Sequence, residues 1–404
     1  MKVKVVSRKL IKPCKSTPSD LRTYKISLID ELNTPINLYR ILYYTSDHAV
    51  DGEEITSLEE SLSRVLPLFY PLAGRYNKEK HYVDCNDEGA EFSIAEVDCQ
   101  LHQLIGPQVN VDQLNHLIPL EIGAADEITD PMLAVQINKF RCGGLAIGSY
   151  ARISTPSYFP SENLAPLYSG LPRTRNTSIL TKRFVFDKNA IYKLRERLRP
   201  EWRNERPPSR VLVVTAVLTQ AILRADREKH GKSRASIIRQ AINVRERTSP
   251  PLSKYACGNW VLMSFLEFTP DDSYGLERNF TGIVSKMREV NIQGIKDCER
   301  ILSDRKFARR ILIDSELEAA ERENSPDLKV IWISDFSKFE DYELDFGYGK
   351  PIWVSLADGP GEDFITLMNT KDNDGIEAWV FMHETDMPYL EQDQDLRMLT
   401  TQCG

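Results

Sequence analysis

The stretch FRCGGLAIGSYARISTPSYFP, residues 140–160, begins as one kind of structure and ends as another. Up to Gly148 its apolar residues are typical of a buried strand, with a tight Gly143-Gly144 pair before them. After Gly148 the apolar run stops, and Ser, Thr and two prolines indicate a loop. Whether a catalytic group follows this strand decides whether the protein catalyses anything.

The whole chain sets the class of protein. Its 404 residues exceed one ordinary core and predict two domains of roughly 200 residues each. With 41% hydrophobic and 27% charged residues, the composition is that of a soluble globular protein. The formal charge of −7 argues against nucleic acid as a partner but leaves room for a small anionic ligand.

Location follows from what the chain lacks. No apolar run approaches the roughly 20 residues of a membrane span, and the basic N-terminus has no secretory signal. The seven cysteines include no CxxC pair, which favours free thiols in a reducing compartment. We therefore expect a cytoplasmic protein that binds no membrane.

Two helices stand out from the periodicity. A capping signal at Thr56 or Ser57 predicts a helix through Phe69, which Pro67 could end a turn earlier. A second and stronger pattern has Ser209 as its N-cap and ends at Gly231.

Strand signals occur at residues 182–187, 235–244, 363–369 and 375–382, and the last two flank a hairpin turn. Helices and strands mix in both halves, so we expect an α/β protein with a cleft between its domains. The Ser-, Pro- and Arg-rich stretch before residue 182 is typical of a linker. The sequence thus predicts domains at residues 1–160 and 182–404, joined by a linker at residues 161–181.

Isolated motifs exclude several enzyme classes. The D-F-G at residues 345–347 has no Gly-rich loop or HRD loop of a kinase beside it. There is no G-x-S-x-G elbow, and no two histidines are spaced as a local metal-ligand pair.

A series of stretches nevertheless resembles one family, the plant BAHD acyltransferases, in its vinorine synthase-like branch. They run in the family's order along almost the whole chain: FYPLAGR (69–75), VDCNDEGAEF (83–92), FRCGGLAIG (140–148), KRFVFD (182–187), INVRERTSPPL (242–252) with CGN (257–259), and YELDFGYGKP (342–351) followed by DGIEAWVFM (374–382). Each motif alone is weak, and the ordered series is specific.

The resemblance implies a two-domain, chloramphenicol-acetyltransferase-like fold with a channel between the domains. It also implies a monomer that holds no bound cofactor and uses acyl-CoA, most simply acetyl-CoA, as co-substrate. The acceptor would be a small molecule such as an alkaloid alcohol. In the family, the histidine of an HxxxD motif removes the acceptor's proton, and the resulting nucleophile attacks the thioester.

The family's second motif, DFGWG, is architectural. Carried over by position, Asp345, Gly347 and Gly349 match its aspartate and glycines, and Tyr348 replaces its tryptophan. The resemblance makes Arg245 the partner of Asp345, through the bidentate geometry that suits guanidinium and carboxylate. A solvated charge at a strand end is the alternative for Arg245.

The HxxxD motif itself is absent. The histidines 48, 81, 102, 116, 230 and 383 are followed four positions later by Gly52, Cys85, Gly106, Leu120, Arg234 and Met387. About one loop and one helix of the N-terminal domain are missing near residue 149, by comparison with the family's pattern. Among nearby substitutes only Tyr150 has a physical argument, since the Arg152 cation could lower its pKa.

The CoA side of the site is better preserved. Ser209 opens a helix, and with Arg210 it begins a segment rich in arginine and lysine, so both are candidates for contacting CoA phosphates. A solvated basic helix is the alternative.

Three hypotheses follow. The chain is an acyltransferase whose catalytic segment is lost from this version of the sequence, a family member that retains only CoA or partner binding, or an unstable remnant.

Overall fold

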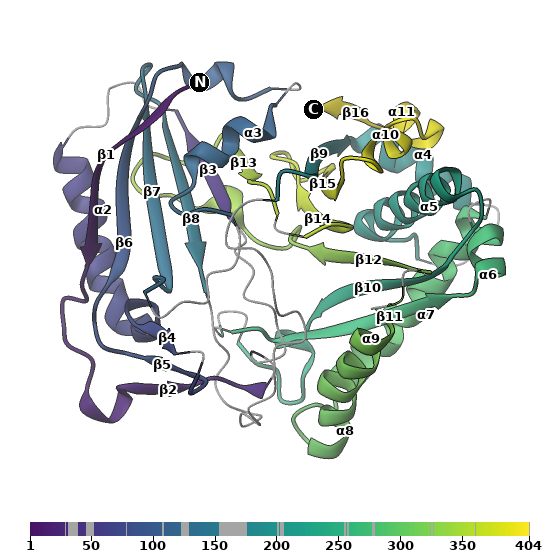
Figure 1. The fold of residues 1–404 in the computed structure, drawn as a ribbon, viewed down its shortest axis with the longest axis horizontal. Helices are drawn as coiled ribbons and strands as arrows, with labels where there is room; N and C mark the ends of the chain where they lie inside the picture. Colours follow the sequence, from purple (N-terminus) through teal and green to yellow (C-terminus); the bar gives the residue numbers. More distant parts are fainter. Residues whose placement is uncertain are drawn as a thin grey trace. The chain divides into compact units, whose positions relative to one another are not determined.

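The computed structural model describes residues 1–404 except for residues 29, 31–38, 46–51, 78, 107–108, 123–128, 153–175, 200–201, 203–205, 254–255, 257, 277–278, 324, 326, 360 and 404. Residue contacts divide the chain into two units (Figure 1). Unit 1 contains Met1–Thr177, Cys257–Asn259 and Glu340–Pro360, and unit 2 contains Ser178–Ala256, Trp260–Phe339 and Gly361–Gly404. Most of the predicted linker, and Ser154 and Ser157 of the opening stretch, lie outside the described residues.

Unit 1 is built on a six-stranded sheet. In spatial order its strands are β1 (Val3–Ile11), β6 (Ala90–Val97), β7 (Leu133–Phe140), β8 (Leu145–Ala151), β3 (Arg40–Tyr44) and β13 (Trp353–Leu356). A small sheet orders β2 (Thr23–Lys25), β5 (Tyr82–Asp84) and β4 (Arg75–Asn77). The helices are α2 (Gly52–Val65) and α3 (Val111–Leu114), with 3-10 turns at Ser19–Leu21, Leu66–Ala73, Leu101–Gln103, Asn115–Leu117 and Asp341–Glu343.

Helix α2 begins about one turn earlier than the sequence predicted. Thr56 lies inside the helix, where its hydroxyl donates to the carbonyl of Gly52 at 2.8 Å. The capping prediction was therefore wrong, because a Ser or Thr hydroxyl inside a helix can bond back to the preceding turn. The helix ends at Val65, before Pro67, as that proline allows.

Unit 2 is built on a seven-stranded mixed sheet. In spatial order its strands are β11 (Val261–Phe268), β10 (Ala235–Asn243), β12 (Leu328–Asp335), β14 (Phe364–Asn369), β15 (Ile376–His383), β9 (Ile179–Phe186) and β16 (Thr401–Cys403). The helices are α4 (Lys188–Leu198), α5 (Arg210–His230), α6 (Pro270–Leu276), α7 (Phe280–Cys298), α8 (Arg305–Arg309), α9 (Ser315–Glu323), α10 (Met387–Glu391) and α11 (Gln394–Leu399). Further single turns lie at Arg245–Arg247 and Arg310–Asp314.

Helix α5 packs its buried residues into this unit's hydrophobic core, and Figure 1 shows it beside α4 and α10. The Ser209 hydroxyl accepts the N–H of Leu212 at 3.1 Å, and Gly231 ends the helix with φ 72°. Both ends are where the sequence predicted them. The predicted hairpin is also confirmed, since β14 and β15 pair antiparallel from Phe364↔Phe381 to Asn369↔Ile376.

Residues 340–360 return to unit 1, although the sequence placed them in the C-terminal domain. Strand β13 pairs antiparallel with β3, with Trp353 opposite Tyr43. Their rings stack at 4.8 Å, and the Tyr43 hydroxyl lies 2.9 Å from the Ser355 hydroxyl. The buried cross-strand contacts hold this distant segment in the first sheet. No helix in the described part of the chain is long and apolar enough to span a membrane.

Candidate functional site

The strand at residues 145–151 runs further than its sequence suggested. Strand β8 continues past Gly148 to Ala151, where Tyr150 pairs with Ala134 of β7 and Ser149 with Arg40 of β3. Next, the Arg152 N–H donates to the carbonyl of Met132 at 2.8 Å. Pairing on both sides outweighs the weak apolar signal of these residues.

Tyr150 is consequently a poor candidate for a general base. Its side chain is 2% exposed and lies against the ring of Tyr39, with 5.8 Å between centroids. Burial raises the pKa of Tyr150 above its ordinary value, and the opposing effect of Arg152 is smaller. The Arg152 guanidinium lies 3.8 Å from the centre of the Tyr76 ring. The pKa shift thus runs opposite to the one that the proposed Tyr150–Arg152 pair required.

Gly148 has a packing role. A Cβ atom at this position would lie 2.0 Å from the carbonyl oxygen of Leu117. The buried Asn138 holds that segment by donating to the same carbonyl at 2.9 Å, and Gln136 donates to the carbonyl of His116 at 3.0 Å. Sequence reasoning missed both amides, although two polar residues within the apolar strand LAVQINKF were a signal. The glycine allows the 115–117 turn to pack directly on the strand.

The DFGYG segment forms a tight turn organised by its own aspartate. One carboxylate oxygen, Asp345 Oδ1, accepts the N–H of Gly347 at 2.8 Å and of Gly349 at 3.0 Å. The two glycines have φ values of 98° and 76°, a region that favours glycine. The motif's role within unit 1 is therefore architectural: the carboxylate fixes the turn.

Strand β3 attaches this turn to the sheet through Tyr44. Its hydroxyl donates to the carbonyl of Leu344 at 3.0 Å, and its ring lies 6.2 Å from that of Tyr348. Burial, and then the negative charge of Asp345, raise the pKa of Tyr44. The Tyr348 that replaces the family's tryptophan thus still contacts an aromatic side chain.

A second attachment is the ion pair between Arg40 and Asp341, at 2.7 Å. Burial raises the pKa of Asp341, against the opposing charge of Arg40. Neither residue was predicted from the sequence, because an isolated Arg and Asp carry no local signal for a pairing between distant segments.

Arg245, the predicted partner of Asp345, lies in unit 2. Its Nε donates to the carbonyl of Ala256 at 2.7 Å, and one terminal nitrogen donates to the Asn243 side chain at 3.2 Å. These bonds brace the loop after β10. The pairing with Asp345 stays a prediction, since the two residues belong to different units.

The CoA-contact candidates lie at the start of α5. Arg210 donates to the backbone carbonyl of Asn373 and, at 2.9 Å, to its side-chain oxygen. Arg195 is close enough that burial and then the charge of Arg210 lower its pKa, and it donates to the carbonyl of Pro208 at 3.0 Å. With Ser209 as the helix cap, these residues place positive charge at a helix N-terminus, which suits an oxyanion.

Among the described residues no group of three or more His, Cys, Asp or Glu could hold a metal ion.

The sequence matches the model of the Transferase family over residues 1–154 and again over residues 151–397. The two matched ranges meet at residues 151–154, directly after β8. The match thus divides into two ranges close to residue 149, where a loop and a helix of the family's pattern are expected to be missing.

Two plant enzymes illustrate the relationship. Pelargonidin 3-O-(6-caffeoylglucoside) 5-O-(6-O-malonylglucoside) 4'''-malonyltransferase of Salvia splendens is 34% identical, over 98% of this chain and 99% of its own. Vinorine synthase of Rauvolfia serpentina is 31% identical, over 95% of each chain. The first alignment spans 435 positions against 404 residues here, so at least 31 positions of that relative have no counterpart.

Solved structures confirm the fold. The crystal structure of vinorine synthase has a TM-score of 0.79 at 30% identity, over 99% of this chain and 98% of that one. TRI101 of F. sporotrichioides, solved with coenzyme A and T-2, has a TM-score of 0.71 at 16% identity, over 95% and 100%, which shows the fold alone. The predicted two-domain, chloramphenicol-acetyltransferase-like α/β architecture is confirmed.

Proposed function

Since this chain belongs to the Transferase family, the plant BAHD acyltransferases, we propose that its complete form transfers an acyl group from acyl-CoA to a hydroxyl of a plant specialised metabolite. The observation that carries this proposal is similarity over 95% or more of the chain to plant acyltransferases. Acetyl is the proposed acyl group and an alkaloid the proposed acceptor class, which the resemblance to vinorine synthase supports. We further propose a cytoplasmic monomer.

The chemistry requires a proton acceptor. The acceptor's O–H loses its proton to a base, the alkoxide forms a bond to the thioester carbonyl carbon, and the C–S bond breaks. The released CoA thiolate then takes a proton. A positioned general base typically increases the reaction rate by a factor of roughly 10²–10⁴. No histidine of this chain belongs to an HxxxD motif.

For the chain as its sequence stands, we propose binding without efficient catalysis. The buried Tyr150, with its raised pKa, supports this second interpretation, because among the described residues after Gly148 it argues against the one substitute base that had a physical argument. The start of α5, with Ser209, Arg210 and Arg195, is the proposed contact for CoA phosphates.

The deciding experiment compares two chains. One has the present sequence, and the other carries an inserted loop and helix with an H-x-x-x-D motif after Ala151, where β8 ends. Acetyl transfer from radiolabelled acetyl-CoA to a panel of alkaloid alcohols should appear only in the second chain. Replacing the inserted histidine by alanine is the control. This replacement should lower the rate of acetyl transfer by a factor of roughly 10²–10⁴.

Binding is measured on the present chain. CoA at 100 times its dissociation constant should stabilise the fold by about 2.7 kcal/mol, visible as a rise in melting temperature. Transfer by the unmodified chain at the rate of the restored chain would refute the loss of catalysis. Absence of CoA binding in both chains would refute the acyltransferase proposal itself. Sequencing the transcript across the codons for residues 148–156 shows which chain the plant makes.

A further inference from the structure

Strand β1 is an edge strand of the unit 1 sheet, and its outer edge is called the margin below (Figure 1). In the described part of the chain it pairs with β6 alone, so alternate residues of its nine direct their backbone N–H and C=O groups away from the sheet. Of these nine side chains, only that of Ile11 is buried. An exposed strand margin of this length is a template for another extended segment.

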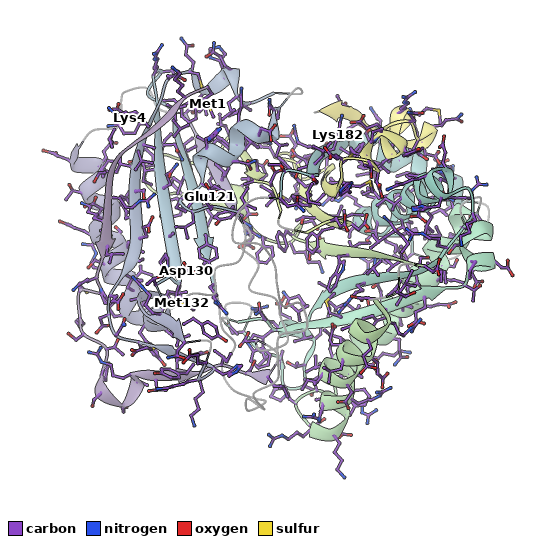
Figure 2. All side chains as sticks on the ribbon, viewed as in Figure 1. Met1, Lys4, Glu121, Asp130, Met132 and Lys182 are labelled. Atoms are coloured by element: carbon purple, nitrogen blue, oxygen red, sulfur yellow. The ribbon has the colours of Figure 1, made fainter. Side chains whose placement is uncertain are left out.

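Strand β1 and the residues on either side of it are strongly basic. Residues 1–15 contain six Lys or Arg and no Asp or Glu, whereas the whole chain carries −7, so the remaining residues carry −13. Two of the six cations are compensated, because Arg8 lies 3.3 Å from Glu91 and Lys9 lies 2.6 Å from Glu59. The described residues provide no ion pair for Lys4, Lys12 or Lys15, and Figure 2 labels Lys4 near the margin of the sheet.

Aliphatic side chains lie among these cations. Val5, Val6 and Leu10 are 42%, 47% and 47% exposed. Exposed apolar residues between cations suit an added strand, because the main chains provide hydrogen bonds and the side chains provide selectivity.

The charges decide the kind of partner. Lysine on a sheet margin opposes pairing with a similar strand, because like charges would face each other. A second copy of β1 is therefore disfavoured, and so is a basic or neutral segment. An extended segment that alternates acidic and aliphatic residues satisfies both the cations and the exposed Val and Leu side chains.

We propose that β1 is a docking strand for an acidic, extended segment of a partner protein, which adds to the sheet beside residues 3–11. The surface consists of Lys4 and the exposed Val5, Val6 and Leu10 on the strand, with Lys12 and Lys15 in the segment that directly follows it. It is independent of the acyl-transfer proposal, since none of these residues takes part in that site.

The test uses the full chain and a nine-residue probe peptide of alternating Glu and Val, matched to the length of β1. Binding is followed by fluorescence anisotropy, and amide hydrogen exchange is measured over residues 3–11. We expect binding that protects these amides and that weakens several-fold as salt is raised. A peptide with Lys in place of Glu should not bind.

Two controls separate strand addition from charge attraction alone. The triple variant Lys4→Glu, Lys12→Glu, Lys15→Glu should lose affinity by at least roughly tenfold. A charge-matched triple variant at the exposed Lys188, Lys193 and Lys371 should keep it. Two further peptides keep all charges and are N-methylated at the backbone amides of one hydrogen-bonding edge or of the other. Only one of the two should lose binding, because an added strand pairs with β1 through one of its edges.

The outcomes are decisive. Absence of peptide binding would overturn the proposal, as would equal losses in the two triple variants or equal binding of both N-methylated peptides. Binding to vesicles that contain phosphatidylserine tests the alternative that the surface binds a membrane. Lysine-dependent binding to vesicles without binding to the peptide would assign the surface to a membrane and refute the proposed partner. Unchanged melting temperatures of both triple variants exclude misfolding.

Discussion

Replacing the buried Arg239 by methionine should destabilise unit 2 strongly. Arg239 on β10 is fully buried, and its terminal nitrogens donate to Glu316 and, at 2.6 Å, to Glu323 of α9. Its guanidinium also lies 3.7 Å from the centre of the Trp332 ring. One cation thus holds two carboxylates and an aromatic side chain in place between a strand and a helix.

The size of the loss follows from burial. The Glu316 and Glu323 side chains are 12% and 9% exposed, so removing the cation leaves two carboxylates with little water and mutual repulsion. Breaking a buried ion pair on one side costs about 3–5 kcal/mol. The exposed pair of Arg310 and Glu318, with side chains 55% and 61% exposed, provides the matched control. Arg310→Met should leave the free energy of unfolding almost unchanged, because water screens this exposed pair.

Urea unfolding followed by tryptophan fluorescence measures both variants, with Trp332 as a local reporter. A triple variant, Arg239→Met with Glu316→Leu and Glu323→Leu, should regain most of the lost stability, because it removes the stranded charges. If Arg239→Met lowers the free energy of unfolding no more than Arg310→Met does, burial does not determine how much the Arg239–Glu316–Glu323 cluster stabilises the fold. If the triple variant stays as unstable as the single one, uncompensated carboxylates are not the cause.

Three further predictions concern single residues. Gly148→Ala should lower the stability of unit 1 by about 1–3 kcal/mol, measured by urea unfolding, because its Cβ would lie 2.0 Å from the Leu117 carbonyl oxygen; an unchanged midpoint would contradict the packing role. Ser209→Ala should cost about 1 kcal/mol through loss of the helix cap, whereas Ser209→Gly should cost less, and equal losses would contradict it. Burial raises the pKa of Asp386, but hydrogen bonds, first from Lys229, outweigh it and leave the pKa below its usual value. Its contribution to stability is therefore complete above the unfolded pKa of about 3.9 and is lost as pH falls through the lower folded value. Asp386→Asn should flatten the acid limb of a stability-against-pH curve, and an unaltered limb would refute this.

Local patterns sufficed for the elements whose signals lie within a few residues. The ends of α5 follow from Ser209 and Gly231, because a cap and a left-handed terminator act on their own turn. The hairpin of β14 and β15 follows from two apolar runs around one polar turn. The ordered motifs also identified the family, and the search for HxxxD needed only the letters.

Tertiary structure decided what depends on residues far apart in the chain. Periodicity did not indicate that β13 would pair with β3, or that Arg40 would bind Asp341, since one strand or one charge is compatible with many partners. It also did not indicate that Tyr150 would be enclosed in the sheet, where burial sets its pKa. Burial and pairing come from the packing of whole elements, and the local sequence alone does not contain that packing.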